Sequence, residues 1–293
     1  MARWLGLFLL AGSAVAYSLA GFFTRLIPLD AVTLLFWRGL FAGLFILLVV
    51  WLRYRRQAWP MIRAIGWPGF GIAVMGSLSS YIYLSSLRLT TVADVAVIYA
   101  TLPFVTAALA WVALREREGW RVLVGSLAAL TGIALMAGGA FRSGHLLGDT
   151  LAFAMTLTYA AMIVLIRRGR HVSMMPAVGI QCLVSALAAA PFARLGPVES
   201  LPLLQLLLFG ICQLGLGLML LSLGMRRVPA TQAALISLLD TPLAPLWVWL
   251  AFGETPPVAT LVGGTVIMAA VCWTIIGSPR PSVLPAAAEA GDA

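Results

Sequence analysis

The chain has 293 residues, of which 62% are hydrophobic and only 10% are charged. This composition lies far from that of soluble globular domains and leaves no room for a soluble catalytic or regulatory domain. The net charge of +9 would suggest nucleic acid as the partner of a soluble protein, but the arginines alternate between loops in a pattern that argues against it.

Ten apolar stretches follow one another along the chain, each about 20 residues long, the length that crosses a bilayer as a helix. They cover residues 4–24, 30–52, 64–87, 92–114, 120–140, 147–167, 174–194, 202–224, 230–252 and 258–277. We therefore predict an all-α integral membrane protein with ten transmembrane helices. Residues 1–142 form the first five-helix unit, residues 143–277 the second, and the Pro/Ala-rich residues 278–293 a disordered cytoplasmic tail.

The arginines predict the orientation of these helices. With the N-terminus inside, 14 arginines fall on the cytoplasmic side and 4 on the opposite side, while Arg38 lies within a span. This asymmetry follows the positive-inside rule. We expect a multi-pass protein of the inner (plasma) membrane with both termini in the cytoplasm.

The two halves repeat each other when the sequence is shifted by 138 positions. The matched residues are Trp111 with Trp249, Ala113 with Ala251, Glu116 with Glu254, and Leu123-Val124-Gly125 with Leu261-Val262-Gly263. Tyr17 and Tyr159 match at a slightly different offset of 142. Because each unit has an odd number of spans, the two copies face opposite sides of the membrane. Two inverted five-helix repeats are typical of carriers that alternate access around a site at the midplane.

Small residues indicate where helices approach closely, since helix contacts in lipid depend on them. The candidates are Gly39, Gly43, Gly125, Gly132, Gly210, Gly217, Gly263 and Gly264. They predict close packing and carry no information about a substrate.

Prolines interrupt the fourth and ninth spans near the bilayer centre, with Pro103 in the first and Pro242 and Pro245 in the second. A proline inside a helix removes a hydrogen bond and frees a carbonyl group. The prolines are either structural kinks or, as their matching positions favour, helix breaks that line a cavity.

Five tyrosines lie well inside their spans: Tyr17, Tyr81, Tyr83, Tyr99 and Tyr159. A buried phenol needs a hydrogen-bond partner, so these residues either join helices or line a cavity for an amphipathic solute. We favour the second interpretation for most of them. Tyr81 and Tyr83 are two positions apart on one helix, so they cannot both face a cavity directly.

Ionisable groups at membrane depth are costly and are therefore candidates for function. Arg38 and Asp240 lie near the middle of the second and ninth spans, and they form either a structural pair or a functional pair that holds a zwitterion or transfers a proton. Gln213 and Ser237 add neutral hydrogen-bonding capacity to the predicted cavity.

Glu116 and Glu254 end the fourth and ninth spans on opposite membrane faces. They either terminate the helices beside interfacial arginines or act as gate or latch residues. The sequence leaves both interpretations open.

The spans that carry these residues resemble a known family. Thr91-Val92-Ala93, Leu102-Pro103, Trp111 and Arg115-Glu116 recur as Pro229-Ala230, Asp240-Thr241, Trp249 and Gly253-Glu254, and Phe36-Trp37-Arg38-Gly39 stands in the second span. This pattern is similar to the duplicated EamA unit of the drug/metabolite transporter superfamily. Within it, chain size and aromatic lining most resemble the YddG-type amino-acid exporters. The resemblance implies ten helices, a central cavity and export of small metabolites.

We therefore expect an exporter of amino acids and related small amphipathic metabolites that works by alternating access. The alternatives are export of other metabolites or drugs, such as nucleobases or cationic compounds, or, further away, a channel or a membrane-embedded enzyme. We expect no enzyme activity, no cofactor, no metal and no nucleic acid, with the lipid bilayer and a small-molecule substrate as partners. The sequence decides neither proton coupling nor the choice between monomer and homodimer.

Overall fold

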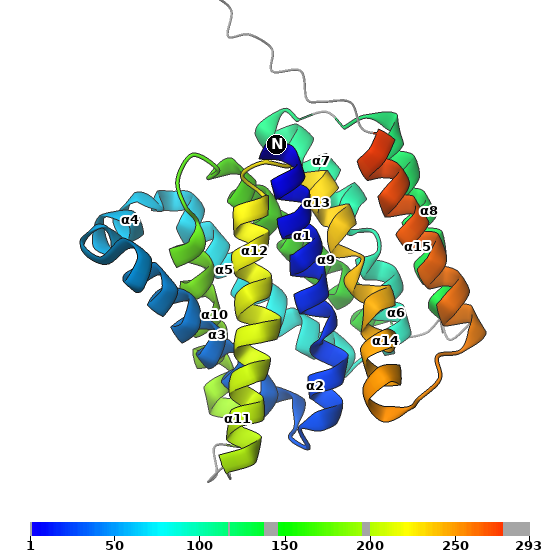
Figure 1. Ribbon diagram of the computed structural model, residues 1–293, viewed down its shortest axis with the longest axis horizontal. Helices are drawn as coiled ribbons and strands as arrows, with labels where there is room; N and C mark the ends of the chain where they lie inside the picture. The colour runs from blue at the N-terminus through cyan, green and yellow to red at the C-terminus, as the bar shows by residue number, and fades with distance from the viewer. Residues whose placement is uncertain (1, 117, 138–145, 195–199, 278–293) are drawn as a thin grey trace, which may run out of the picture.

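The structure is a computed structural model that describes residues 2–116, 118–137, 146–194 and 200–277 (Figure 1). Within these residues the chain forms helices, turns and loops and no strand. The predicted junction between the halves at residues 142–143 and the predicted tail 278–293 lie outside the described residues. The prediction of an all-α membrane protein is confirmed.

The first half contains a series of helices that runs from the N-terminus to residue 137. They are α1 (Ala2–Ser18), α2 (Ala20–Leu26), α3 (Ala31–Tyr54), the short 3₁₀ turn η1 (Arg55–Gln57), α4 (Ala58–Ala64), α5 (Gly66–Leu87), α6 (Val92–Tyr99), α7 (Leu102–Leu114) and α8 (Trp120–Ala137).

The second half repeats this order from residue 146. Its elements are α9 (Leu146–Arg168), α10 (Met175–Ala189), the 3₁₀ turn η2 (Ala190–Phe192), α11 (Ser200–Leu208), the π-helix η3 (Phe209–Gly215), α12 (Leu216–Gly224), α13 (Ala230–Ser237), α14 (Asp240–Phe252) and α15 (Val258–Gly277).

Nine helical segments of the described chain are long and apolar enough to cross a membrane. α5, which corresponds to the third predicted span (residues 64–87), is not among them, although its 22 residues suffice to cross. Its five serines and two tyrosines give it more hydroxyl groups than any other long helix in the first half.

The helices of the two halves interleave rather than forming separate bundles (Figure 1). α5 packs along α9 in the same way that α12 packs along α1, and α3 and α10 pack against each other, as do α8 and α15. The repeat relates these contacts to one another. In the second half, α9 is the counterpart of α1 and α2, and the segment from α11 to α12 is the counterpart of α5. We call the end of the molecule that holds the C-terminus of α2, at the bottom of Figure 1, the outer end, and the opposite end the inner end.

The fourth span of each repeat is broken at its middle. α6 ends at Tyr99 and α7 begins at Leu102, while α13 ends at Ser237 and α14 begins at Asp240. Residues 100–101 and 238–239 between the segments are separated by the same 138 positions as the sequence repeat. Both breaks therefore occur at one position of the repeated unit.

The broken spans also end alike. Arg115 directly follows α7 and Gly253 directly follows α14, and both lie in the left-handed region, with φ of 54° and 71°. Glycine adopts this conformation without strain and is the usual residue after a helix, whereas arginine is uncommon there. Because the chain turns sharply at these residues, Glu116 and Glu254 leave their helices in a fixed direction.

The predicted glycines lie at helix crossings. A Cβ atom on Gly132 would lie 2.7 Å from the carbonyl oxygen of Gly263, and one on Gly263 would lie 2.2 Å from the carbonyl oxygen of Gly132. Gly39 and Gly43 similarly meet α10. In lipid, such close backbone approach replaces the hydrophobic driving force that packs helices in water.

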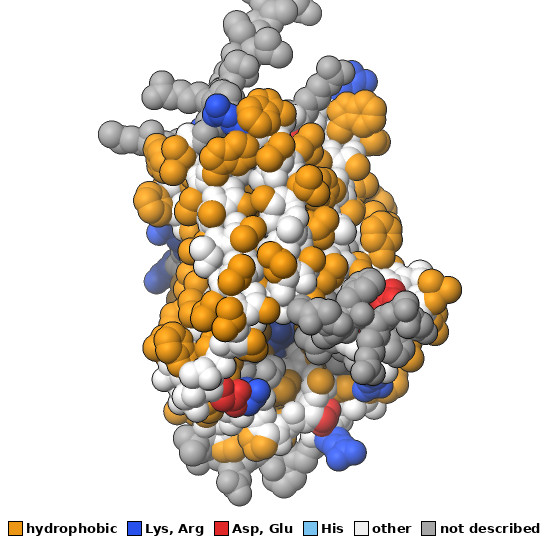
Figure 2. Space-filling view, turned by 90° about the vertical axis from the view of Figure 1, so that its right-hand side faces the viewer, with side chains coloured by type: hydrophobic (Ala, Val, Ile, Leu, Met, Phe, Trp, Pro, Cys, Tyr) orange, Lys and Arg blue, Asp and Glu red, His pale blue; other side chains and the backbone are white. Residues whose placement is uncertain are grey.

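The exterior over α8 and α15 is covered by apolar side chains, with charged side chains mainly toward its two ends (Figure 2). Exposed members of this surface include Leu123, Val124, Leu127, Leu135, Leu261, Val262, Met268 and Ile276. An apolar exterior of this extent is unsuited to water and suits the hydrocarbon core of a bilayer.

Candidate functional site

Three tyrosines meet at the centre of the molecule, where the broken helices pass. The rings of Tyr99 in α6 and Tyr159 in α9 lie 6.1 Å apart between centroids, at an interplanar angle of 47°. The hydroxyl of Tyr159 lies near the hydroxyls of Tyr99 and Tyr17. Each phenol thus has a polar neighbour at membrane depth, where a buried tyrosine needs one.

Asp240 lies beside this tyrosine cluster. It is the first residue of α14, directly after the helix break, and its Oδ1 accepts a hydrogen bond of 3.1 Å from the hydroxyl of Thr241. The carboxylate interacts electrostatically with Tyr99, Tyr159 and Tyr83. A carboxylate is stabilised at a helix N-terminus, so the break itself helps to hold this charge inside the membrane.

Arg38 in α3 approaches the cluster from another side. Its Nη1 donates a hydrogen bond of 3.4 Å to the side-chain oxygen of Gln213, and its guanidinium lies 5.5 Å from the ring centre of Phe209. Gln213 in turn donates a 3.4 Å hydrogen bond to the backbone oxygen of Tyr17. The Nε atom of Arg38 is buried and has no hydrogen-bond partner among the described residues.

The two charges do not pair with each other. The described residues contain no ion pair between Arg38 and Asp240, and Tyr83 interacts electrostatically with both groups. Arg38, Asp240, Tyr99 and Tyr159 are all half-buried rather than fully enclosed. The arrangement places a cation and an anion near one tyrosine, each charge without an oppositely charged partner among the described residues.

Gln213 is held by the π-helix η3, an irregular segment that the sequence analysis did not predict. π-helical turns are rare and often occur at functional sites. Gly210 in the same segment lies against the backbone of α3 at Arg38, where a Cβ atom would meet the Arg38 carbonyl oxygen at 3.0 Å. The lack of a side chain at Gly210 brings η3 close to α3 beside the arginine.

Two of the predicted residues lie apart from this cluster. Tyr81 points into a groove between α3, α5 and α10, on a different side of α5 from Tyr83. Ser237 is 4% exposed and donates its hydroxyl to the carbonyl of Ala233 within its own helix. Neither side chain contacts Arg38 or Asp240 in the described part of the chain.

The predicted prolines lie beside the helix breaks. Pro103 occupies the first turn of α7, where a missing backbone N–H group leaves no helical bond unmade. Pro242 occupies the first turn of α14, whereas Pro245 lies inside that helix. The chain thus places its prolines so that each half-span restarts directly after the break.

An ion pair lies at the inner end of the molecule. Glu116, which follows α7, accepts a 3.0 Å hydrogen bond from Nε of Arg167 in α9, and Arg170 lies 3.8 Å from the same carboxylate oxygen. Arg167 also donates to the carbonyl of Met225 at 3.0 Å. The side chain of Arg167 is only 10% exposed. The pair connects the first half of the chain to the second.

A second ion pair lies at the outer end. Arg25 in α2 pairs with Glu254, which follows α14, and both side chains are about half exposed. This pair also joins the two halves. The sequence analysis singled out both glutamates but not their arginine partners. The offset of 142 that relates Tyr17 to Tyr159 also relates Arg25 to Arg167, so the same signal would have found them.

Glu118 is a further acidic residue that the sequence analysis did not consider. It lies in the inner loop after α7, and its Oε1 atom is buried without a hydrogen-bond partner among the described residues. Burial raises the pKa of this carboxyl above its ordinary value, and Glu116 acts in the same direction, while Thr231 and Arg167 offset part of the effect.

An interleaved pair of inverted helical repeats, with broken spans around half-buried polar groups, is the architecture of membrane transporters. The chain matches the EamA-like transporter family over residues 4–138 and 146–276, and it belongs to that family, which is part of the drug/metabolite transporter superfamily. The closer resemblance to YddG-type amino-acid exporters stays a prediction.

A solved structure, described only as the crystal structure of a protein, shares this fold. It superposes with a TM-score of 0.77 at 19% sequence identity, covering 92% of this chain and 96% of its own. Among curated proteins, none matches the chain. At this identity the likeness shows the fold alone.

Proposed function

We propose that this transporter exports amino acids and related small amphipathic metabolites across the inner membrane. The observation that carries the proposal is that Arg38 and Asp240 do not pair with each other although both interact with Tyr83. A free amino acid carries a carboxylate and an ammonium group on the same carbon atom. Arg38 is the complement of the first charge and Asp240 of the second, because charge-assisted hydrogen bonds are the strongest that side chains form.

The tyrosine cluster provides the remaining contacts of the proposed site. Tyr99 and Tyr159 present aromatic faces beside Asp240, and such faces accept an apolar or aromatic side chain and also stabilise a nearby ammonium group. Their hydroxyls and that of Tyr17 add polar groups to the proposed site. We therefore place the substrate between Arg38, Asp240 and the two facing tyrosines.

The two ion pairs form the proposed gates. Glu116 with Arg167 holds the inner ends of α7 and α9 together, and Glu254 with Arg25 holds the outer ends of α14 and α2 together. Glu116 follows α7, the inner half of the first broken span, and Glu254 follows α14, the outer half of the second. Movement of either half-span about its break would separate its ion pair. Opening one pair while the other stays closed would give alternating access to a midplane site.

Export is the proposed direction of transport. With both termini in the cytoplasm, the proposed gate of Glu116 and Arg167 faces the cytoplasm. It is more buried than the gate of Glu254 and Arg25, and its residues have additional partners in Arg170 and the Met225 carbonyl. Energy coupling by proton exchange at Asp240 and passive export down a gradient are both compatible with this geometry. No enzyme activity forms part of the proposal.

Counterflow of labelled amino acids in proteoliposomes tests the proposed function. We expect saturable exchange of phenylalanine, methionine or threonine by the wild-type protein and at least a tenfold loss for Tyr99→Ala, since one aromatic contact and one hydroxyl contact disappear. Tyr81→Ala is the matched control, because Tyr81 lies outside the central cluster. It should exchange at nearly the wild-type rate.

Other outcomes of this experiment would redirect the proposal. Exchange of nucleobases or cationic compounds in place of amino acids would support the alternative cargo on the same fold. Flux that does not saturate, without counterflow, would indicate a channel. Equal loss in Tyr99→Ala and Tyr81→Ala would contradict the placement of the site.

A further inference from the structure

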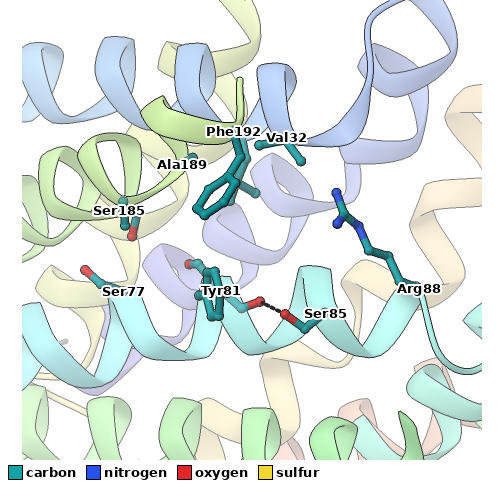
Figure 3. A pocket seen from close by; sticks show the side chains of 11 residues that line it. Val32, Ser77, Tyr81, Ser85, Arg88, Ser185, Ala189 and Phe192 are labelled. Atoms are coloured by element: carbon teal, nitrogen blue, oxygen red, sulfur yellow. Dashed lines mark hydrogen bonds between the residues drawn. The ribbon is translucent and has the colours of Figure 1, made fainter. Parts of the chain in front are cut away.

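A groove lies between α3, α5 and α10 near the outer end of the molecule (Figure 3). α3 and α5 each pack along α10, and their outer ends leave an open cavity of about 100 Å³ between them. Its lining combines four serines with Tyr81, Arg88 and an apolar wall that includes Phe192. The central cluster does not share these residues.

The deep part of the groove contains an unpartnered hydroxyl. Ser185 in α10 is 7% exposed, and its Oγ atom has no hydrogen-bond partner among the described residues. Ser77 on the facing wall is already bonded to the carbonyl of Gln181, at 3.1 Å. A buried polar atom without a partner is rare in folded proteins and indicates a missing donor or acceptor.

The outer rim of the groove carries a free positive charge. Arg88 follows α5, is exposed, and its guanidinium makes no hydrogen bond or ion pair with the described residues. No acidic residue lines the groove. A guanidinium with nearby hydroxyls matches the geometry of a phosphate group.

The groove continues into an exposed apolar face of α5. Exposed apolar side chains run along one face of α5 at spacings of three and four residues, as Trp67, Phe70, Val74 and Leu78, and this row ends at Tyr81 in the groove. A continuous apolar row of this kind lies against lipid chains. The rim with Arg88 stands at the end of the span, at the depth of the headgroups.

We propose that this groove is a binding site for a phospholipid of the outer leaflet. The phosphate is held by Arg88, an ester carbonyl accepts the hydroxyl of Ser185, and an acyl chain follows the apolar row of α5 toward the bilayer centre. The lipid fills the space between the outer ends of α3 and α5, both of which pack along α10. This site is independent of the proposed transport function.

Native mass spectrometry of the purified full chain, titrated with dioleoylphosphatidylglycerol, tests the site. We expect Arg88→Gln to weaken binding of the first lipid about tenfold, because one charge-assisted contact is lost, and Ser185→Val to weaken it about threefold. Arg56→Gln removes an equally exposed arginine at the inner end and should leave the affinity unchanged. Phenylalanine added to the lipid-bound protein should displace no lipid.

Two results would overturn the proposal. One is the same lipid affinity for wild type, Arg88→Gln and Ser185→Val. The other is displacement of the lipid by phenylalanine with the same dependence on Arg88, which would make the groove part of the transport route. Neither result depends on whether amino acids are the cargo, so the two proposals fail separately.

Discussion

Arg167 in α9 and Arg25 in α2 occupy equivalent positions of the two repeats, and each pairs with the glutamate that follows the broken span of the other repeat. The inverted duplication has thus produced one ion pair at each end of the molecule. The pairs differ in their surroundings: Arg167 is 10% exposed and Arg25 is 56% exposed.

The inner pair should contribute more to stability than the outer pair. Glu116→Gln leaves Arg167 largely buried without its counter-charge, at a cost of roughly 2 kcal/mol, whereas Glu254→Gln removes an exposed contact with an effect of about 0–1 kcal/mol. Thermal unfolding of the two variants in the same detergent measures the difference. Equal shifts of Tm would show that burial of the inner pair is unimportant.

The identity of the gates can be tested by exchanging charges. The double variant Glu116→Arg with Arg167→Glu restores opposite charges across the proposed inner gate, so we expect it to recover much of the transport lost by either single variant. Counterflow measures the three variants side by side. A double variant no better than the worse single variant would argue against a direct role of the pair.

Asp240→Asn should reduce amino-acid exchange at least tenfold. The substrate ammonium loses a charged partner that contributes about 1.5–3 kcal/mol, while the side chain keeps its shape and its contact with Thr241. Exchange is measured between pH 5.5 and 8 for variant and wild type. If transport and its pH dependence both remain, Asp240 carries neither the substrate nor a proton.

Stability should depend on pH through Glu118. Its pKa is raised above the ordinary value of 4.5, mainly by burial. The folded protein therefore binds this proton more tightly than the unfolded chain, and the stability gained at low pH is lost as pH rises above about 4.5 through the raised pKa. Glu118→Gln lacks this loss, so its Tm relative to the wild type should increase between pH 4.5 and 8. A constant Tm difference over this range would rule the effect out.

The crossing of α8 and α15 should not tolerate added volume. A methyl group on Gly263 would overlap the Gly132 carbonyl oxygen, so Gly263→Ala forces the helices apart and costs about 1–3 kcal/mol. Gly119→Ala is the control, because a Cβ atom there meets nothing within 4 Å. Thermal unfolding should show a lower Tm for Gly263→Ala alone, and an unchanged Tm would mean that the helices separate without penalty.

Much of the architecture could be predicted from the sequence. The apolar stretches require helices, because backbone groups in lipid must be satisfied within each segment. The shift of 138 residues, carried by pairs such as Trp111 and Trp249, indicated the inverted repeat, and the family match over both halves agrees with it. Even the different directions of Tyr81 and Tyr83 followed from helical periodicity.

The partners of the polar residues were decided by the tertiary structure. Arg38 and Asp240 are 202 positions apart, and only the packing of α3, η3 and α14 keeps them unpaired around Tyr83. The partners of Glu116 and Glu254 likewise depend on how α9 and α2 cross the broken spans. Sequence periodicity is local and determines which face of a helix is polar. Which distant groups meet depends on how helices from both halves pack, and that arrangement exists only in the folded chain.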